Sequence, residues 1–201
     1  MKIDLGDGFQ FIRNGLSVKQ DSRAAGLPIS RIETISKSNV DPQRVGYANL
    51  DGAKYDEWLL QHDDILFSHI NSIQHLGKCA IYEGLPPKLI HGMNLLCFRA
   101  DKSVVHPPYI LHYFRSKVFR PKLERFIKPA VNQASVSIKD LKSIEIDLPP
   151  LVEQRRISEV LDKVDAIKTK HLNAVSHLDS ILNVLSHAAF KGELFDKGTA
   201  R

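Results

Sequence analysis

The sequence predicts an α+β protein, with a mixed body of short strands and helices followed by one long C-terminal helix. Short runs of apolar residues, separated by glycine and proline, fill most of the chain. After Pro149–Pro150 the apolar spacing becomes that of a helix and stays so to Ala189. We therefore expect a globular domain over residues 1–148, a helix over 149–191 and a tail over 192–201.

The composition is that of an ordinary globular protein. Apolar residues make up 43% and charged residues 25% of the 201 residues, enough for a substantial core. The sequence has no run of about eighteen apolar residues, so no membrane span is expected. The start MKIDLGDGFQF lacks the apolar core of a signal peptide. Cys79 and Cys97 lie in apolar, strand-like contexts, and we expect buried thiols in a reducing cytoplasm.

Four segments of the body have the pattern of strands. Apolar residues dominate them, and turn residues such as Gly77, Gly84 and Gly92 separate them. In the last segment apolar and polar residues alternate, which predicts one buried face. The segments are ILFSHI (Ile65–Ile70), KCAIY (Lys78–Tyr82), NLLCFRA (Asn94–Ala100) and SIEIDL (Ser143–Leu148).

Two helical segments are expected between the later strands. The run PPYILHYFRSKVFRPKLERF, residues 107–126, has an apolar side that includes Tyr109 and Phe114, and Pro121 is expected to end or kink the helix. SIKDLKS, residues 137–143, opens with the Ser-x-x-Asp pattern of a helix N-terminus, which predicts a short helical turn.

The C-terminal helix carries a heptad seam. Its seam positions follow alternating steps of four and three residues, with polar residues at Lys168 and His171, flanked by Ile167 and Leu172. A helix of about 57 Å, at ~1.5 Å per residue, must bury such a seam against another helix. The chain has one such helix, so a second copy or another protein is expected to cover it. The apolar seam comprises Ile157, Leu161, Val164, Val175, Leu178, Leu182, Leu185 and Ala189.

Positive charge is concentrated in one segment. RSKVFRPKLERFIK, residues 115–128, holds six cations and one acid, a net charge of +5 that equals the +5 of the whole chain. An otherwise neutral protein with one basic segment offers a docking place for a polyanion such as DNA, although a solvated helix face has the same pattern. The cations are Arg115, Lys117, Arg120, Lys122, Arg125 and Lys128.

The sequence contains no recognisable catalytic constellation. The string HPPY resembles the Asp/Asn-Pro-Pro-Tyr/Phe motif of amino-methyltransferases, but His106 stands where the acceptor for the exocyclic amine should be. No glycine-rich loop follows a strand to hold S-adenosylmethionine. Ser68 and His69 are adjacent and would point to opposite faces of a strand, and the histidines lack metal-ligand spacing. We expect no catalysis, metal site or cofactor on this chain.

The remaining candidates are residues that could read DNA bases. Asn and Gln side chains can bond adenine bidentately, and Arg or Lys can bond guanine. Such residues gather in SHINSIQHLGK (Ser68–Lys78) and KPAVNQASVS (Lys128–Ser137), although they are also common in any loop. The candidates are Arg31, Asn71, Gln74, Lys78, Asn132 and Gln133.

Three stretches resemble the specificity subunits of type I restriction–modification systems. They occur in the family's order and span most of the chain. The most specific feature is Leu-Pro-Pro-Leu-x-Glu-Gln followed by a long helix. The stretches are DDILFSHINSIQHLGKCAIYEG (Asp63–Gly84), VNQASVSIKDLKSIEIDLPPLVEQRRI (Val131–Ile157) and SHAAFKGEL (Ser186–Leu194).

The resemblance implies that residues 1–148 are a target recognition domain, which reads half of a split DNA target. Family members normally carry two such domains and two long helices. The helices pack antiparallel and dock modification subunits, which bind S-adenosylmethionine and methylate adenine; a restriction–translocase subunit can join them. The resemblance further implies that loops between strands read bases and that residues 115–128 contact phosphates.

This sequence resembles a half-size specificity subunit, with one domain and one helix. The resemblance then implies a homodimer, joined by an antiparallel coiled coil, that reads two inverted half-sites. A heterodimer with another half-subunit and a truncated remnant are the alternatives. A scaffold that docks a protein partner through the helix, without binding DNA, is a competing function.

Overall fold

The body of the protein is built on a four-stranded antiparallel sheet with the strand order β2–β6–β3–β5. The computed structural model describes residues 1–21, 25–131 and 133–194. The expected α+β class is confirmed, because this sheet is accompanied by separate helices and two smaller sheets. The strands of the main sheet are β2 (Phe9–Asn14), β6 (Leu96–Ala100), β3 (Ile65–Phe67) and β5 (Cys79–Ile81).

Both faces of this sheet are covered. Consecutive side chains of a strand point to opposite faces, and all three residues of β3 are buried. Ile65 and Phe67 pack into one apolar cluster, whereas Leu66 packs into another. The first cluster contains a group of Phe rings with centroids 4.9–6.4 Å apart, contributed by Phe9, Phe67, Phe98, Phe114 and Phe119. Both predicted thiols, Cys79 and Cys97, are buried and free.

Two smaller sheets join segments that are distant in the sequence. One pairs β1 (Lys2–Asp4) with β9 (Glu145–Asp147), and the other has the order β4–β8–β7. The connection between β1 and β2 and the connection between β2 and β3 contain short 3-10 helices. The remaining elements are β4 (Ile70–Asn71), β8 (Ala134–Ser135), β7 (Lys128–Pro129), and the 3-10 helices η1 (Leu5–Gly8), η2 (Ile32–Ile35) and η3 (Ala53–Trp58).

The four predicted strands are confirmed, with one correction at ILFSHI. This segment forms two strands, β3 and β4, which belong to different sheets. The chain changes partner between Ser68 and His69. Ser68 exchanges backbone hydrogen bonds with Gly77 and Lys78 on the β5 side, whereas the His69 carbonyl accepts from the Val136 N–H on the β8 side. This change of hydrogen-bonding partner divides the segment into two strands.

The predicted break at Pro121 is wrong in its position. Helix α1 (Pro107–Arg115) ends before Ser116, and α2 (Phe119–Glu124) begins after it. The Ser116 hydroxyl accepts from the N–H groups of Val118 and Phe119, both at 3.2 Å, and so starts the second helix. Pro121 lies in the first turn of α2, where a missing N–H removes no helical hydrogen bond.

Two predicted helix ends are confirmed. Helix α3 (Ile138–Lys142) begins after Ser137, whose hydroxyl accepts from the Asp140 N–H at 3.1 Å. At the other end of the chain, helix α4 (Leu151–Lys191) stops where Gly192 takes a φ of +74°. Glycine adopts this left-handed conformation without a steric penalty, which is why it commonly follows a helix.

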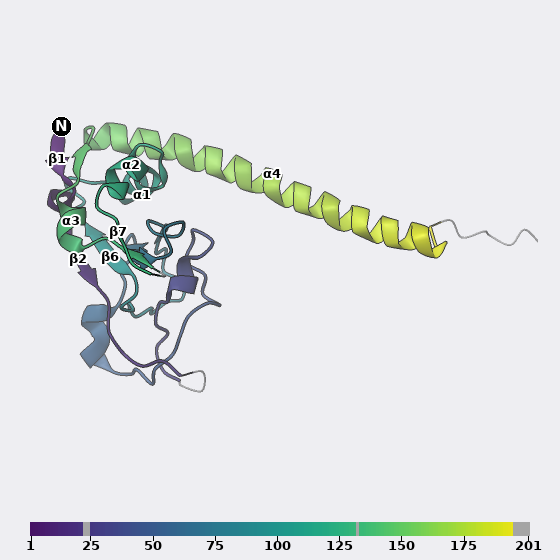
Figure 1. Ribbon diagram of the computed structural model, residues 1–201, viewed down its shortest axis with the longest axis horizontal. Helices are drawn as coiled ribbons and strands as arrows, with labels where there is room; N and C mark the ends of the chain where they lie inside the picture. Colours follow the sequence, from purple (N-terminus) through teal and green to yellow (C-terminus); the bar gives the residue numbers. More distant parts are fainter. Residues whose placement is uncertain (22–24, 132, 195–201) are drawn as a thin grey trace, which may run out of the picture. The chain divides into compact units, whose positions relative to one another are not determined.

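Helix α4 is one continuous helix of 41 residues (Figure 1). The first compact unit of the chain runs from Met1 to Ser158, and the rest of the helix belongs to a second unit. Only two described residues of α4, Gln154 and Ser158, are buried. The first two turns of the helix are therefore part of the body, and the body extends past the predicted boundary at residue 148.

Two buried histidines should make stability fall at acid pH. His69 and His91 are 5% and 1% exposed, and burial lowers the pKa of each imidazole from 6.5 to about 4. Below pH 6.5 the unfolded chain takes up protons that the folded chain refuses, so the unfolding free energy falls between pH 6.5 and about 4. We expect a loss of up to about 4 kcal/mol between pH 7 and 5, measured by urea unfolding. An unfolding free energy that stayed flat over this range would show that both imidazoles protonate in the folded chain.

Candidate nucleic-acid interface

The basic segment 115–128 lies on α1, α2 and the start of β7, but its cations are not equivalent. Two of the six, Lys117 and Arg125, are exposed, and their side chains form no hydrogen bond or ion pair with the residues that the structure describes. Lys122 donates to the Glu145 carbonyl at 2.7 Å, and Lys128 forms an ion pair with Asp140 at 3.3 Å. Lys117 and Arg125 are therefore the cations most available to an external anion.

The two remaining arginines bind backbone carbonyls of other segments. Arg120 donates to the carbonyls of Leu76 at 2.7 Å and Ile73 at 3.0 Å, both in the connection between β4 and β5. Arg115 donates to the carbonyl of Cys79 at 3.2 Å and also to that of Ser38. These guanidinium groups hold other segments against α1 and α2. Nothing in the sequence indicates this role.

The β4–β5 connection forms an exposed turn. The carbonyl of Ser72 accepts from the N–H groups of His75 and Leu76, and this closes one helix-like turn. Ile73, Gln74 and His75 are exposed on it, and Ile73 keeps 52% of its side chain accessible. The turn therefore presents one apolar side chain between polar ones, with its carbonyls directed at Arg120.

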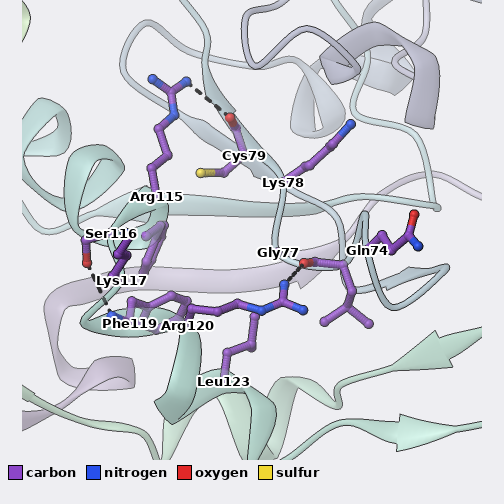
Figure 2. A pocket seen from close by; sticks show the side chains of 12 residues that line it. Gln74, Gly77, Lys78, Cys79, Arg115, Ser116, Lys117, Phe119, Arg120 and Leu123 are labelled. Carbon is purple, nitrogen blue, oxygen red and sulfur yellow. Dashed lines mark hydrogen bonds between the residues drawn. The ribbon is translucent and has the colours of Figure 1, made fainter. Parts of the chain in front are cut away.

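Residues of this turn and of the basic segment together line a pocket of about 320 Å³ (Figure 2). Gln74 and Lys78 line it from the loop, while Arg115 of α1, Arg120 of α2 and Lys117 of the connection between these helices line it from the basic segment. The side chains of Gln74 and Lys78 extend away from the Arg120 guanidinium (Figure 2). The structure thus brings two of the predicted base readers together with three of the predicted backbone contacts.

A smaller pocket, of about 130 Å³, adds one further predicted base reader, Asn71, and shares Lys78 with the first pocket. Asn71 and Lys78 line it opposite Glu33 of η2. The Asn71 amide donates to the Ser68 hydroxyl at 3.1 Å and accepts from the Ser72 N–H at 2.8 Å, so it already has local partners. Lys78 donates to the Ser36 carbonyl at 3.3 Å, which ties η2 to the β4–β5 loop.

Two other predicted base readers, Arg31 and Gln133, are not among the residues that line these two pockets. Arg31 is exposed just before η2 and pairs with Glu33 at 3.5 Å. Gln133 is exposed in the turn between β7 and β8, where its carbonyl accepts from the Ala130 N–H at 2.7 Å. Asn132 lies outside the described residues. Ile73, His75 and Glu33 accompany the candidates in the structure, although nothing in their sequence context distinguishes them from other loop residues.

The string HPPY has an ordinary structural explanation. Pro107 occupies the first position of α1, where its fixed φ suits the start of a helix. The N–H of His106 donates to the Gln154 side chain at 2.8 Å, and Tyr109 packs against the main core. Among the described residues no group of three His, Cys, Asp or Glu side chains is arranged to hold a metal ion, and no helix could cross a membrane.

The predicted seam of α4 is exposed along the whole described helix. Leu178 and Leu182 keep 65% and 62% of their surface accessible. A further apolar row lies beside the seam, formed by Val160, Ile167 and Ile181, each more than half exposed. A strip this wide exceeds the narrow seam of a two-stranded coiled coil. The seam residues are Ile157, Leu161, Val164, Val175, Leu178, Leu182 and Leu185.

Comparison with known proteins finds that this chain is similar to specificity subunits of type I restriction enzymes from an archaeon and a bacterium. A Methanocaldococcus jannaschii protein provisionally named as the specificity subunit of type I restriction enzyme MjaX is 42% identical over 97% of this chain and 45% of its own length. The type I restriction enzyme EcoKI specificity subunit of Escherichia coli K12 is 30% identical over 91% of this chain and 40% of its own length. The chain therefore spans less than half the length of these relatives.

Solved structures share the fold. A protein from a study of complex assembly and conformational transition in the type I R-M system aligns with a TM-score of 0.66 and 23% identity, over 96% of this chain and 46% of its own. The HsdS subunit from Thermoanaerobacter tengcongensis aligns with a TM-score of 0.61 and 22% identity, over 96% and 45%. The sequence profile described as "Type I restriction modification DNA specificity domain" matches residues 1–177. The chain belongs to the family of type I restriction–modification DNA specificity proteins.

Proposed function

We propose that this chain is a sequence-specific DNA-binding subunit that reads one half-site and performs no catalysis itself. The observation that carries the proposal is the pocket between the exposed turn at Gln74 and the basic segment at Lys117, in a chain of the specificity family. Amide and apolar side chains suited to base edges stand there beside cations suited to phosphates. In this proposal the body contacts DNA in the major groove, and the exposed cations contact the adjoining backbone.

We further propose that α4 pairs antiparallel with a second long helix, contributed by another copy of this chain. The exposed seam supports this pairing, since a leucine-rich strip is unstable in water without a partner helix. Two copies related by a two-fold axis would read two inverted half-sites separated by a spacer. Pairing with a different half-subunit is the alternative, and a heterodimer formed on co-expression would support it.

The row at Val160, Ile167 and Ile181 supports an additional partner. A helix with apolar residues beside its seam fits a bundle of more than two helices, because a third helix covers the extra row. We propose that modification subunits, which would carry S-adenosylmethionine and methylate adenine, dock there. Methylation mapping in cells that carry this chain with a modification subunit would identify the sequence read and the spacer.

Neutralising Lys117 and Arg125 together should weaken binding to all duplexes alike. Each phosphate contact contributes about −0.9 to the slope of log affinity against log salt concentration, so Lys117→Gln with Arg125→Gln should make the slope shallower by about 1.8. The slope is measured by fluorescence anisotropy with a labelled duplex at salt concentrations from about 50 to about 300 mM. This range is chosen because electrostatic screening changes steeply within it.

The matched control is Lys54→Gln with Lys88→Gln, which removes the same charge from exposed positions of other segments. This pair should leave the slope within error of the parent chain. If both pairs changed the slope equally, the basic segment would not be the backbone contact. If the parent chain bound no duplex and selected no sequence from a random library, the proposal of DNA recognition itself would fail.

A further inference from the structure

Arg120 has little capacity left for a phosphate. Its Nε donates to the Glu124 carboxylate at 2.7 Å, one terminal nitrogen donates to the Leu76 carbonyl at 2.7 Å and the other to the Ile73 carbonyl at 3.0 Å. All three guanidinium nitrogens are therefore engaged, in a fork that joins α2 to the turn. A lysine at this position would offer one donor atom instead of three and would lack the planar fork.

A glycine next to the turn also allows the loop to pack closely against α2. Gly77 has a φ of +88°, and a Cβ built on it would lie 2.8 Å from Leu123 Cδ2. A residue with a Cβ would strain the backbone at this φ, and either the Leu123 side chain or the loop would have to shift. Arg115 holds the far end of the same loop through the Cys79 carbonyl. Hydrogen bonds and close packing thus hold the loop from two sides, while the side chains of Ile73, Gln74 and His75 remain exposed.

We propose that Arg120, with Arg115, is a positioning residue for sequence discrimination, and that the turn at Ser72–Leu76 is the element it positions. The inference rests on the proposed DNA-binding function and deepens it. Gln74 is suited to bond the N6 and N7 atoms of adenine, and Ile73 is suited to pack on a thymine methyl group. Such contacts require the turn to be held in a fixed position. The planar Arg120 guanidinium holds the turn by its backbone carbonyls, which leaves the side chains of Ile73 and Gln74 available for bases.

Three variants separate positioning from phosphate contact. Their affinities are measured for the duplex that the parent chain selects from a random library and for a scrambled duplex of equal length. Arg120→Gln should reduce the ratio of these affinities about tenfold and leave the salt slope on scrambled DNA unchanged. Gly77→Ala should reproduce this loss although it removes no charge. Lys117→Gln should keep the ratio and make the slope shallower by about 0.9.

Two further measurements keep the test independent of misfolding. Amide hydrogen exchange across residues 72–79 should accelerate in Arg120→Gln and Gly77→Ala, while the main sheet stays protected. Arg120→Lys should restore part of the affinity ratio, since one bond to the turn can re-form. The inference is overturned if Arg120→Gln keeps the ratio and makes the slope shallower, as a phosphate contact would. It is also overturned if Gly77→Ala discriminates as well as the parent. A parent chain that selects no sequence would instead remove the proposed function.

Discussion

Replacing Leu178 and Leu182 with glutamate is expected to convert a dimer of this chain into monomers. Both leucines are more than 60% exposed in the single chain and lie four residues apart on the α4 seam. Burying a leucine contributes about 1.5–3 kcal/mol, and a two-fold dimer buries each position twice, so the variant forgoes roughly 6–12 kcal/mol. Glutamate would add the cost of burying unpaired charge. Light scattering coupled to gel filtration measures the mass directly.

The control variant for this experiment adds the same two negative charges to α4, but at positions away from the seam. Asn173 and Ser180 are seven residues apart, on the side of the helix opposite the seam, and both are exposed. Asn173→Glu with Ser180→Glu should therefore remain dimeric. A dimer that survives the leucine replacements would show that α4 is not the interface, and a parent chain that is monomeric at all concentrations would overturn the pairing of two copies.

Replacing Gln154 with leucine should be the most damaging single change at the start of α4. Its side chain is 1% exposed and makes three hydrogen bonds to the backbone of the body. Nε2 donates to the carbonyls of Val104 at 3.0 Å and Pro149 at 2.9 Å, while Oε1 accepts from the His106 N–H at 2.8 Å. Leucine would remove the Gln154 hydrogen bonds from three partly buried backbone groups, at about 1 kcal/mol or more each. We expect a loss of about 3 kcal/mol or more in urea unfolding.

Ser158 offers a matched comparison for Gln154. It is equally buried on the same helix, but among the described residues its hydroxyl bonds only the Arg155 carbonyl of the preceding turn, at 2.9 Å. Ser158→Ala should cost less than about 1 kcal/mol, because no backbone group of the body loses a partner. Equal losses for the two variants would mean that the three bonds of Gln154 contribute no more than an ordinary helix contact.

The family and its long helix were predictable because their signals are local. A heptad seam depends only on residue spacing, and the sequence Leu-Pro-Pro-Leu-x-Glu-Gln marks the change from strand to helix within seven residues. The capping role of Ser137 and the stop at Gly192 were predictable for the same reason. Ser137 acts through its hydroxyl and Gly192 through its backbone conformation, and each affects only the helical turn beside it.

The candidate interface was predictable only in part. Basic residues that are close in the sequence suggest a shared surface. However, nothing in the sequence indicates that two of the arginines bind backbone carbonyls 36 and 44 residues away. Every residue has a carbonyl, so a bond to one leaves no trace in composition or spacing. The same applies to the Asn71 amide, which is satisfied by Ser68 and Ser72 rather than free.

The α+β class, the long helix with an apolar seam, and the concentration of positive charge in residues 115–128 all follow from local sequence patterns. These depend on periodicity and composition, which the unfolded chain already carries. Tertiary structure alone decided which cations stay available, where ILFSHI changes sheets, and how Gln154 fastens α4 to the body. Each of those outcomes depends on which distant backbone group lies within hydrogen-bonding reach, and only packing of the complete chain determines that.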